Sequence, residues 1–336
     1  MNNIYFRVDM NSQIATGHMM RCLSIADEVR EQGGEAIFIT ADENACELLT
    51  ERGFDYIVLN TKWDKMEEEL PKLENIINEK KIKKLIIDSY YATGKYLNVV
   101  DNWTKILYID DLNRKDLQVN TILSYPVYAD ENFYKKYYLE DKVKLLIGAD
   151  YTPLRRVFKD VPDKKIRKNI ERVLILSGGS DPYDTIKQCI NVLIENNIRE
   201  IYAIYGRYSD RVDTIKNTYK NEQRVHVYES VDNIEKYMQE ADLCISASGT
   251  TLYELCACGT PTLSYILADN QIDNALGFDK KGIIPCLGDV RKENIANRIS
   301  EELEKMKSEV NRKDLSEKMK SVVDGQGCRR IVGEFG

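Results

Sequence analysis

Short apolar runs and helical periods alternate along the whole chain. The runs predict buried strands at residues 4–8, 35–40, 56–59, 85–88, 106–110, 173–177, 201–205, 225–228, 243–246 and 262–266. Between them, apolar residues recur at helical spacing. In the first such segment the shared face predicts a helix that begins at His18 and stops at Gly33-Gly34; its apolar positions are Met19, Cys22, Leu23, Ala26 and Val29. Strands that alternate with helices indicate parallel sheets covered on both faces.

A charged stretch, residues 159–172, interrupts this pattern and is predicted to link two domains. We expect an N-terminal Rossmann-like domain at 1–158, which carries the catalytic loop, and a C-terminal one at 159–336. The tail from 292 to 323 is predicted to be helical, and the C-terminal helix could belong to either domain. Both halves begin with a strand, a glycine-containing loop and a helix, but neither carries G-x-G-x-x-G or a Walker A loop.

Composition narrows the class of protein. The net charge of -7 argues against a broad nucleic-acid or anionic-membrane surface. No apolar run approaches the roughly 20 residues that span a bilayer, and the N-terminus lacks the apolar core of a signal peptide. The eight cysteines form no C-x-x-C pair and the chain has only two histidines, so neither a metal site nor a cofactor is predicted. We expect a cytoplasmic enzyme, monomeric or a weak homo-oligomer, without a membrane span.

The loop between the first strand and the first helix carries candidate chemistry. Gly17 lets the backbone approach a ligand, and the helix N-terminus presents unpaired N–H groups. The field there disfavours an imidazolium, so His18 is suited to act as a neutral general base. Arg21, one turn later, could hold an anionic group. The alternative is that His18 merely caps the helix and Arg21 is a solvated charge.

A second strand-to-helix corner has a pattern that is typical of phosphate sites. Small residues lead into a helix whose first N–H groups are free to bind an anion; they are Ser248, Gly249, Thr250 and Thr251. Glu254 fits a capping box with Thr251 on spacing alone. Asn270 and Gln271, between a strand and a helix, could bind sugar hydroxyl or acetamido groups, unless Asp269 or Asn270 simply caps that helix. Another candidate contact, or an ordinary turn, is formed by Gly178, Gly179 and Ser180.

Seven ordered motifs span nearly the full length. They are RVDMNSQIATGHMMRCLSIA (7–26), LIIDSYY (85–91), YIDD (108–111), IGADYTPLRRVF (147–158), LSGGSDP (176–182), ISASGTTLYELCACGTPT (245–262) and ADNQ (268–271). This set resembles the UDP-sugar hydrolases of pseudaminic acid biosynthesis and their spore-coat polysaccharide relatives. Ala15 departs from the pattern, which usually has glycine there.

The resemblance implies two Rossmann-like α/β domains of the glycosyltransferase-B type with a nucleotide-sugar in the cleft between them. It implies that the second corner holds the UDP diphosphate, that Glu254 takes the ribose hydroxyls, and that Asn270 and Gln271 reach the cleft. It also marks Tyr90 as facing the substrate. Asp110 and Asp111 are adjacent and so point to opposite faces of a strand. We expect Asp9 or Asp111 to orient His18, which places Asp9 and Tyr90 with His18 in the catalytic group and Asp111 among the substrate-binding residues.

The expected reaction is hydrolysis of a UDP-linked sugar. His18 would take a proton from water, water would attack the anomeric carbon from the face opposite the nucleotide, and UDP would leave without needing a carboxylic acid. The resemblance implies UDP-2,4-diacetamido-2,4,6-trideoxy-altropyranose as substrate, and the spore-coat relatives leave the sugar open. One alternative is a glycosyltransferase that moves the sugar to an acceptor. Another is a protein that binds a UDP-sugar without catalysis.

Overall fold

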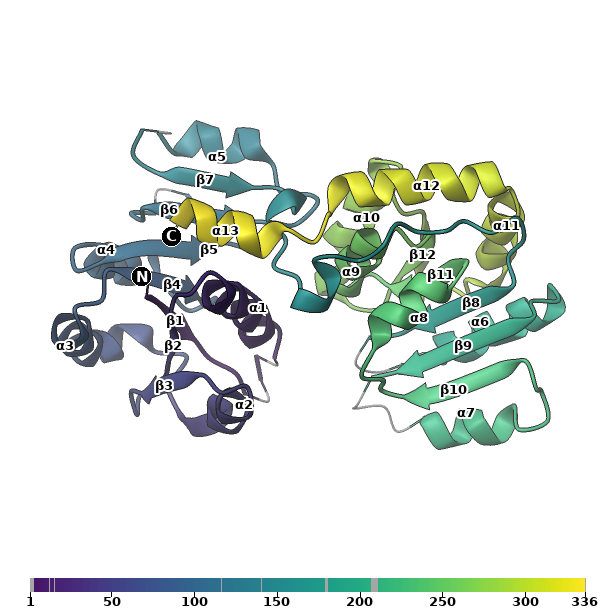
Figure 1. The fold of residues 1–336 in the computed structure, drawn as a ribbon, viewed down its shortest axis with the longest axis horizontal. Coiled ribbons are helices and arrows are strands. Elements are labelled where there is room, and N and C mark those ends of the chain that lie inside the picture. The colour runs from purple at the N-terminus through teal and green to yellow at the C-terminus, as the bar shows by residue number, and fades with distance from the viewer. Residues whose placement is uncertain are drawn as a thin grey trace. The chain divides into compact units, whose positions relative to one another are not determined.

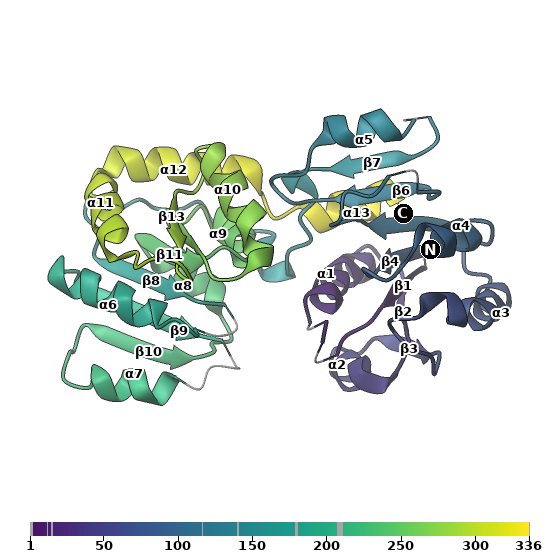
Figure 2. The ribbon, with the colours of Figure 1, turned by 180° about the vertical axis from the view of Figure 1, so that it is seen from behind.

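The computed structural model describes residues 3–335 apart from 12, 15, 116, 140, 179, 180 and 207–210. Its contacts divide the chain into two compact units, residues 1–156 with 326–336 and residues 157–325 (Figures 1 and 2). Each unit is a parallel sheet covered by helices. Two of the predicted ligand residues, Gly179 and Ser180, lie outside the described residues, as does Ala15.

The sheet of unit 1 has the strand order β3-β2-β1-β4-β5-β6-β7, and every pair is parallel. The strands are β1 (Ile4–Val8), β2 (Ala36–Thr40), β3 (Asp55–Val58), β4 (Lys84–Asp88), β5 (Lys105–Ile109), β6 (Thr121–Ser124) and β7 (Lys144–Ile147). The order reverses between β1 and β4, which makes the carboxyl ends of these two strands the switch point where ligands bind in such sheets.

Helices cover both faces of this sheet. Those of unit 1 are α1 (Gly17–Glu31), α2 (Cys46–Glu51), α3 (Leu70–Lys80), α4 (Gly94–Asp101), α5 (Glu131–Tyr137) and α13 (Gly327–Phe335). One apolar cluster joins α1, α2 and α13 to one face, and a second joins α3, α4 and α5 to the other. The C-terminal helix α13 therefore belongs to unit 1, where Ile331 and Phe335 complete the core under α1.

Unit 2 repeats the architecture with the strand order β10-β9-β8-β11-β12-β13, again all parallel. Its strands are β8 (Arg172–Leu176), β9 (Glu200–Tyr205), β10 (Val225–Glu229), β11 (Leu243–Ala247), β12 (Thr262–Ile266) and β13 (Cys286–Asp289). Its helices are α6 (Thr185–Glu195), α7 (Val212–Thr218), α8 (Ile234–Glu240), α9 (Thr251–Cys258), α10 (Ile272–Lys280), α11 (Ala296–Met306) and α12 (Glu309–Val322). The switch point here lies between β8 and β11.

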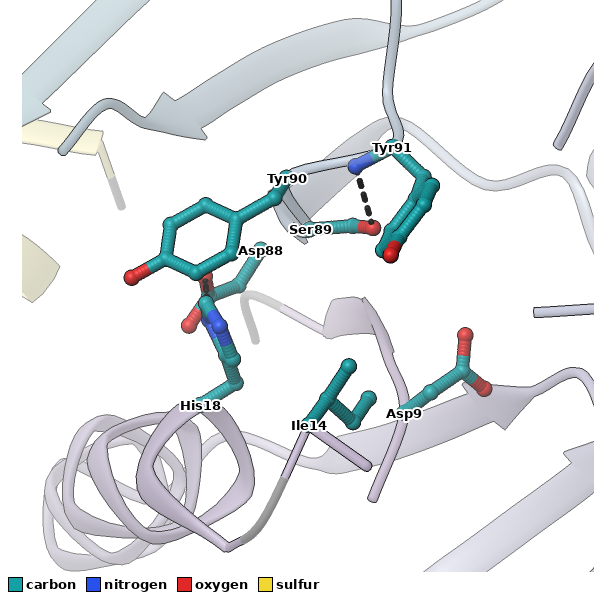
Figure 3. Close-up of a pocket in the computed structure, with 7 residues that line it drawn as sticks. All are labelled: Asp9, Ile14, His18, Asp88, Ser89, Tyr90 and Tyr91. Carbon is teal, nitrogen blue, oxygen red and sulfur yellow. Dashed lines mark hydrogen bonds and ion pairs between the residues drawn. The ribbon is translucent and has the colours of Figure 1, made fainter. Parts of the chain in front are cut away.

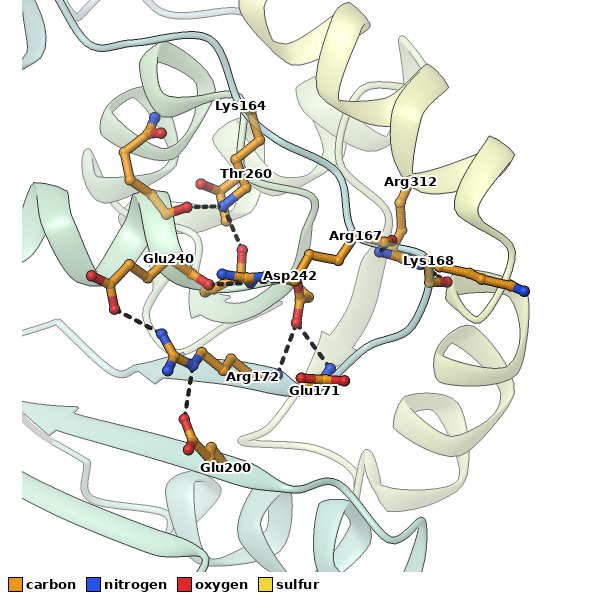
Figure 4. A network of polar contacts seen from close by, with 12 residues as sticks. Lys164, Arg167, Lys168, Glu171, Arg172, Glu200, Glu240, Asp242, Thr260 and Arg312 are labelled. Atoms are coloured by element: carbon orange, nitrogen blue, oxygen red, sulfur yellow. Dashed lines mark hydrogen bonds and ion pairs between the residues drawn. The ribbon is translucent and has the colours of Figure 1, made fainter.

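The charged segment 159–172, which the sequence predicts as a linker, packs against unit 2 through hydrogen bonds (Figure 4). The Lys164 ammonium donates to the carbonyl oxygens of Met238 and Gln239, 3.0 and 2.6 Å away, at the C-terminal end of α8. Burial lowers the pKa of Lys164 to about 8. Arg312 on α12, fully buried, donates to the carbonyl oxygens of Arg167 and Lys168. These contacts tie the segment to the C-terminal end of α8 and to α12, so the segment is an integral part of unit 2.

Among the described residues, no helix combines the length and apolar character that a membrane crossing needs. All eight cysteines lie in the described part and are free.

Candidate active site

The first strand-to-helix corner, residues 8–21, is called the histidine corner here. It lies at the switch point of unit 1, where the carboxyl end of β4 stands beside that of β1. His18 on α1 is buried, with 8% of its surface exposed, and its Nδ1 lies 2.6 Å from Oδ1 of Asp88, the last residue of β4. Arg21 Nη2 lies 3.0 Å from the same nitrogen. The Asp88 carboxylate is closer and can only accept, so we assign the proton to Nδ1, which then donates to Asp88. This tautomer leaves Nε2 with the lone pair that a general base needs.

Arg21 binds the same carboxylate from the other side. Its Nε donates to Asp88 Oδ2 at 2.6 Å and its Nη2 to Oδ1 at 2.5 Å, while Nη1 donates to Tyr125 Oη at 2.9 Å and lies 2.8 Å from Asp111 Oδ2. Burial alone would raise the pKa of Asp88, but the charge of Arg21 and the contacts with Arg21 and His18 hold it well below its usual range. Asp88 is therefore an anion at neutral pH.

Tyr90 stands over the imidazole (Figure 3). Its ring meets that of His18 edge to face with centroids 4.5 Å apart, and its hydroxyl donates to Asp111 Oδ2 at 3.3 Å. Burial, followed by the charge of Asp111, raises the pKa of Tyr90 to about 12, so the phenol keeps its proton at neutral pH. About half of the Tyr90 side chain is exposed, which leaves it able to touch a ligand.

A small pocket opens beside these groups. It is lined by Asp9, Ile14, His18, Asp88, Ser89, Tyr90 and Tyr91, and it has room for about one water molecule. A water held there would lie next to the histidine that can take its proton. Within the described part of the chain, no group of three or more His, Cys, Asp or Glu side chains is arranged to hold a metal ion.

The expectation that Asp9 or Asp111 orients His18 is wrong, because Asp88 takes that position. Asp9 accepts hydrogen bonds from Arg7 at 2.6 Å and from the Ala41 amide at 2.7 Å, and so is tied to the core. Asp111 pairs with Arg21 and Tyr90 instead.

The alternative roles for His18 as a helix cap and for Arg21 as a solvated charge are not what the structure shows. Thr16, not His18, is the N-cap of α1. Arg21 is no solvated charge, because only 11% of its side chain is exposed and its donors already serve Asp88, Asp111 and Tyr125. Most of the Arg21 donors are therefore committed within unit 1, and the two short contacts with Asp88 hold that carboxylate in place.

The second corner, residues 246–254, is called the serine corner here. It follows β11 at the switch point of unit 2 and leads into α9, whose N-cap is Thr250 without a side-chain bond to the cap. The alternative role for Glu254, a capping box with Thr251, is not formed, since Thr250 and not Thr251 is the N-cap. The amides of Leu252 and Tyr253 donate to the carbonyl oxygens of Gly249 and Thr250, at 3.2 and 3.0 Å. No such contact with another described residue engages the preceding amides of Gly249, Thr250 and Thr251, and amides of this kind at a helix start can bind phosphate.

The side chain of Ser248 is used within the protein. Its hydroxyl and its amide both donate to the Tyr265 carbonyl oxygen, at 2.8 and 2.9 Å. Ser248 therefore anchors the turn, and its hydroxyl is not free for a ligand.

Gly249 is not required by the fold. A Cβ on Gly249 would meet only Gln271 Nε2, at 3.9 Å, and its φ is not positive. Gly17 is similar, because nothing lies within 4 Å of a Cβ placed there. Two glycines without a structural need, each at the start of a helix at a switch point, favour close approach of a ligand.

The segment around Asn270 forms a 3₁₀ turn, Asp269–Gln271, after β12. Gln271 Oε1 accepts the Leu267 amide at 3.0 Å, whereas the side chain of Asn270 is exposed. Helix α10 has Gln271 as its N-cap, so neither Asp269 nor Asn270 caps it. Gly178 has φ +75°, a conformation that glycine adopts readily after β8.

Asp88 is the candidate site residue that sequence reasoning missed. The signal was present, because Asp88 ends an apolar strand in the LIIDSYY motif, and paired parallel strands end at the same edge of a sheet. What the sequence lacks is the strand order, which alone shows that β4 is the neighbour of β1.

Comparisons with known proteins extend the description. Residues 173–326 match the family model described as the glycosyltransferase family 28 C-terminal domain. The chain is 24% identical to the spore coat polysaccharide biosynthesis protein SpsG of Bacillus subtilis over 281 residues, which cover 81% of this chain and 79% of SpsG. It is 26% identical to the pseudaminic acid cytidylyltransferase and UDP-2,4-diacetamido-2,4,6-trideoxy-beta-L-altropyranose hydrolase of Helicobacter pylori over 273 residues, or 80% of this chain.

This chain spans only 45% of the Helicobacter protein. It likewise spans 55% of the uncharacterized protein MJ1062 of Methanocaldococcus jannaschii, to which it is 26% identical over 275 residues, 79% of this chain. Among solved structures, MurG of Acinetobacter baumannii aligns over 100% of this chain and 99% of its own, with a TM-score of 0.75 at 12% identity. The prediction of two Rossmann-like α/β domains of the glycosyltransferase-B type is confirmed by this likeness and by the sheet topology.

Proposed function

We propose that this protein is a hydrolase that cleaves a UDP-linked sugar at its anomeric carbon. The observation that carries the proposal is the His18–Asp88 pair beside a pocket with room for about one water molecule. The Helicobacter relative, whose name includes a UDP-sugar hydrolase, supports the substrate class. The diacetamido-trideoxy sugar of that name is the first candidate, and a spore-coat sugar is the second.

In the proposed reaction, Nε2 of His18 takes a proton from water as the water oxygen bonds to the anomeric carbon. The bond between that carbon and the phosphate oxygen breaks, and UDP leaves with the electron pair. Asp88 holds the imidazole in the required tautomer and stabilises the imidazolium that forms, a role that carboxylates have beside catalytic histidines. Tyr90 would contact the sugar, because it covers the imidazole and remains half exposed.

Unit 2 would hold the nucleotide. The N–H groups that start α9 would bind the diphosphate, where negative charge grows as UDP departs. Glu254, in the first turn of α9 and only partly buried, would accept hydrogen bonds from the ribose hydroxyls. Asn270 and Gln271 would contact the sugar substituents. No metal or cofactor takes part in this scheme.

The second candidate is a glycosyltransferase, which the match to a glycosyltransferase family 28 domain favours. It would use the same base on an acceptor hydroxyl instead of water. The deciding experiment is UDP release from candidate UDP-sugars without any acceptor, in water enriched in oxygen-18. A hydrolase releases UDP promptly and places the label on the sugar. A transferase releases UDP only after an acceptor is added, and a binding protein releases none.

His18→Gln tests the base. General-base catalysis contributes about 10² to 10⁴ in rate, so we expect UDP release to fall by about that factor with the affinity for UDP unchanged. Calorimetry with UDP and a turnover assay separate the two effects. Turnover within threefold of wild type would remove His18 from the mechanism.

A further inference from the structure

The turn that begins the serine corner is held by a side chain for which the proposed chemistry has no role. Asn274, on α10, is 7% exposed. Its Nδ2 donates to the carbonyl oxygens of Ser248 and Gly249, at 2.9 and 3.2 Å. Its Oδ1 accepts the hydroxyl of Tyr253, on α9, at 2.6 Å. All the polar atoms of this amide are therefore engaged, and a single orientation of the amide satisfies all three contacts.

These contacts determine where the amides of the turn point. In a trans peptide the C=O of one residue and the N–H of the next lie in one plane and point in opposite directions. The chain has no cis peptide among its described residues. Asn274 draws the Ser248 and Gly249 carbonyls toward the core, so the N–H groups of Gly249 and Thr250 must face the opposite way. The same contacts sequester two oxygens that would repel an anion.

We propose that Asn274 is the positioning residue of the diphosphate-binding turn. It does not touch the ligand; it sets the direction of the N–H groups that do. This inference rests on the proposed function, because it takes the serine corner to be the diphosphate site. It goes beyond that function in assigning the pre-organisation of the site to one buried amide and its Tyr253 partner.

Asn274→Asp tests the proposal, because it is close to isosteric and keeps an acceptor for Tyr253. It replaces the donor with a carboxylate that repels both carbonyls, so the two peptide planes should rotate. Loss of buried hydrogen bonds of this kind corresponds to about a 10- to 100-fold rise in the Kd for UDP. The affinity for uridine, which has no phosphate, should change less than threefold, and that contrast is one a general loss of structure would not produce.

Ser316→Ala is the matched control. The Ser316 hydroxyl, on α12, donates to the Gly259 carbonyl oxygen at 2.5 Å, at the other end of α9. Like the Asn274 variant, Ser316→Ala removes a buried donor from a backbone carbonyl next to α9. Thermal stability should therefore fall while the Kd for UDP stays within twofold. If Asn274→Asp does not fold, Asn274→Ala, which removes the donors without adding charge, replaces it with an expected rise of about fivefold.

The possible outcomes separate this inference from the proposed function. If wild-type protein does not bind UDP, the proposed function fails. Two results would show that Asn274 is not the positioning residue while the proposed function stands. In the first, the folded Asn274 variant binds UDP as tightly as wild type does. In the second, the variant's affinities for UDP and for uridine fall by the same factor. A selective loss of UDP supports both.

Discussion

The histidine corner and the serine corner have the same backbone plan and opposite chemistry. Each is a strand, a turn and a helix at the switch point of a parallel sheet. In the first, charged side chains from three segments of the chain converge: Asp88 lies between His18 and Arg21, and Arg21 also reaches Asp111. In the second, the described contacts join neutral groups, namely hydroxyls, an amide and backbone carbonyls. The first arrangement controls a proton, and the second presents N–H groups to an anion.

Among the substitutions that test this comparison, Asp88→Asn should have the largest effect, and that effect should be on turnover. The amide can donate to Nδ1 of His18, which would move the imidazole proton to Nε2 and remove the base. We expect turnover to fall by about 10²-fold or more, as for other carboxylates that fix a histidine tautomer, with UDP affinity unchanged. Steady-state kinetics and calorimetry on the same preparation measure both.

Asp110→Asn is the matched control for Asp88→Asn. Asp110 follows the adjacent strand β5, is fully buried, and accepts the Tyr134 hydroxyl and the amides of Leu112 and Arg114 without a recorded contact to His18. Its substitution should lower stability and leave turnover within a few-fold. Equal losses of turnover in the two variants would mean that any buried charge at this edge matters, and not the His18–Asp88 pair.

In the serine corner, the next largest effect is expected from Glu254→Gln. If the Glu254 carboxylate accepts the ribose hydroxyls, the loss of charge-assisted hydrogen bonds should raise the Kd for UDP about tenfold. The Kd for 2′-deoxy-UDP should change less, because one of the two contacts is already missing. Identical changes for both nucleotides would contradict a ribose contact.

The sequence predicts features that depend on local patterns better than contacts between elements that are distant in the chain. Strands with long apolar runs were predicted to within about two residues, whereas β6, β7 and β13 were missed. The run at β7 is short and begins with a lysine, and β13 contains Gly288 and ends in Asp289, so neither reads as a buried strand. The strand-turn-helix placement of both corners was predicted correctly, with Gly17 and His18 in the first and Gly249 in the second, because local spacing marks such positions.

Contacts between elements distant in sequence were not found. Asp88 reaches His18 across 70 residues of chain, and Asn274 reaches Ser248 across 26. Nothing in the local pattern says which strand lies beside β1, or that a residue in the third position of α10 faces the turn before α9. Ligand binding by both corners stays a prediction.

Smaller effects are expected from the two glycines. Gly249→Ala meets no protein atom closer than Gln271 Nε2 at 3.9 Å, so the free energy of unfolding should not fall. A methyl group at a ligand contact should still weaken UDP binding by about three- to tenfold, because it holds the backbone away from phosphate. Gly17→Ala should likewise preserve stability and instead lower turnover. If Gly17→Ala instead weakened UDP binding, and Gly249→Ala lowered only turnover, the roles assigned to the two corners would be reversed.

The smallest expected effect concerns acid stability, and it has opposite signs in the two units. The pKa of Asp88 is held below its usual range, so its ionised form stabilises unit 1 above the ordinary carboxyl pKa of about 3.9, and that contribution is lost as pH falls through the lower, folded-state pKa. Burial raises the pKa of Asp181, which accepts the amides of Thr185 and Ile186 in unit 2, so protonation there favours the folded state.

Between pH 7 and pH 5 the stability of wild type relative to Asp88→Asn should be constant, and this difference should shrink below about pH 4. Relative to Asp181→Asn, wild type should gain stability as the pH falls toward that value. Thermal midpoints of the three proteins across this range measure both stability differences. If both differences changed with pH in the same direction, the opposite pKa shifts assigned to Asp88 and Asp181 would be contradicted.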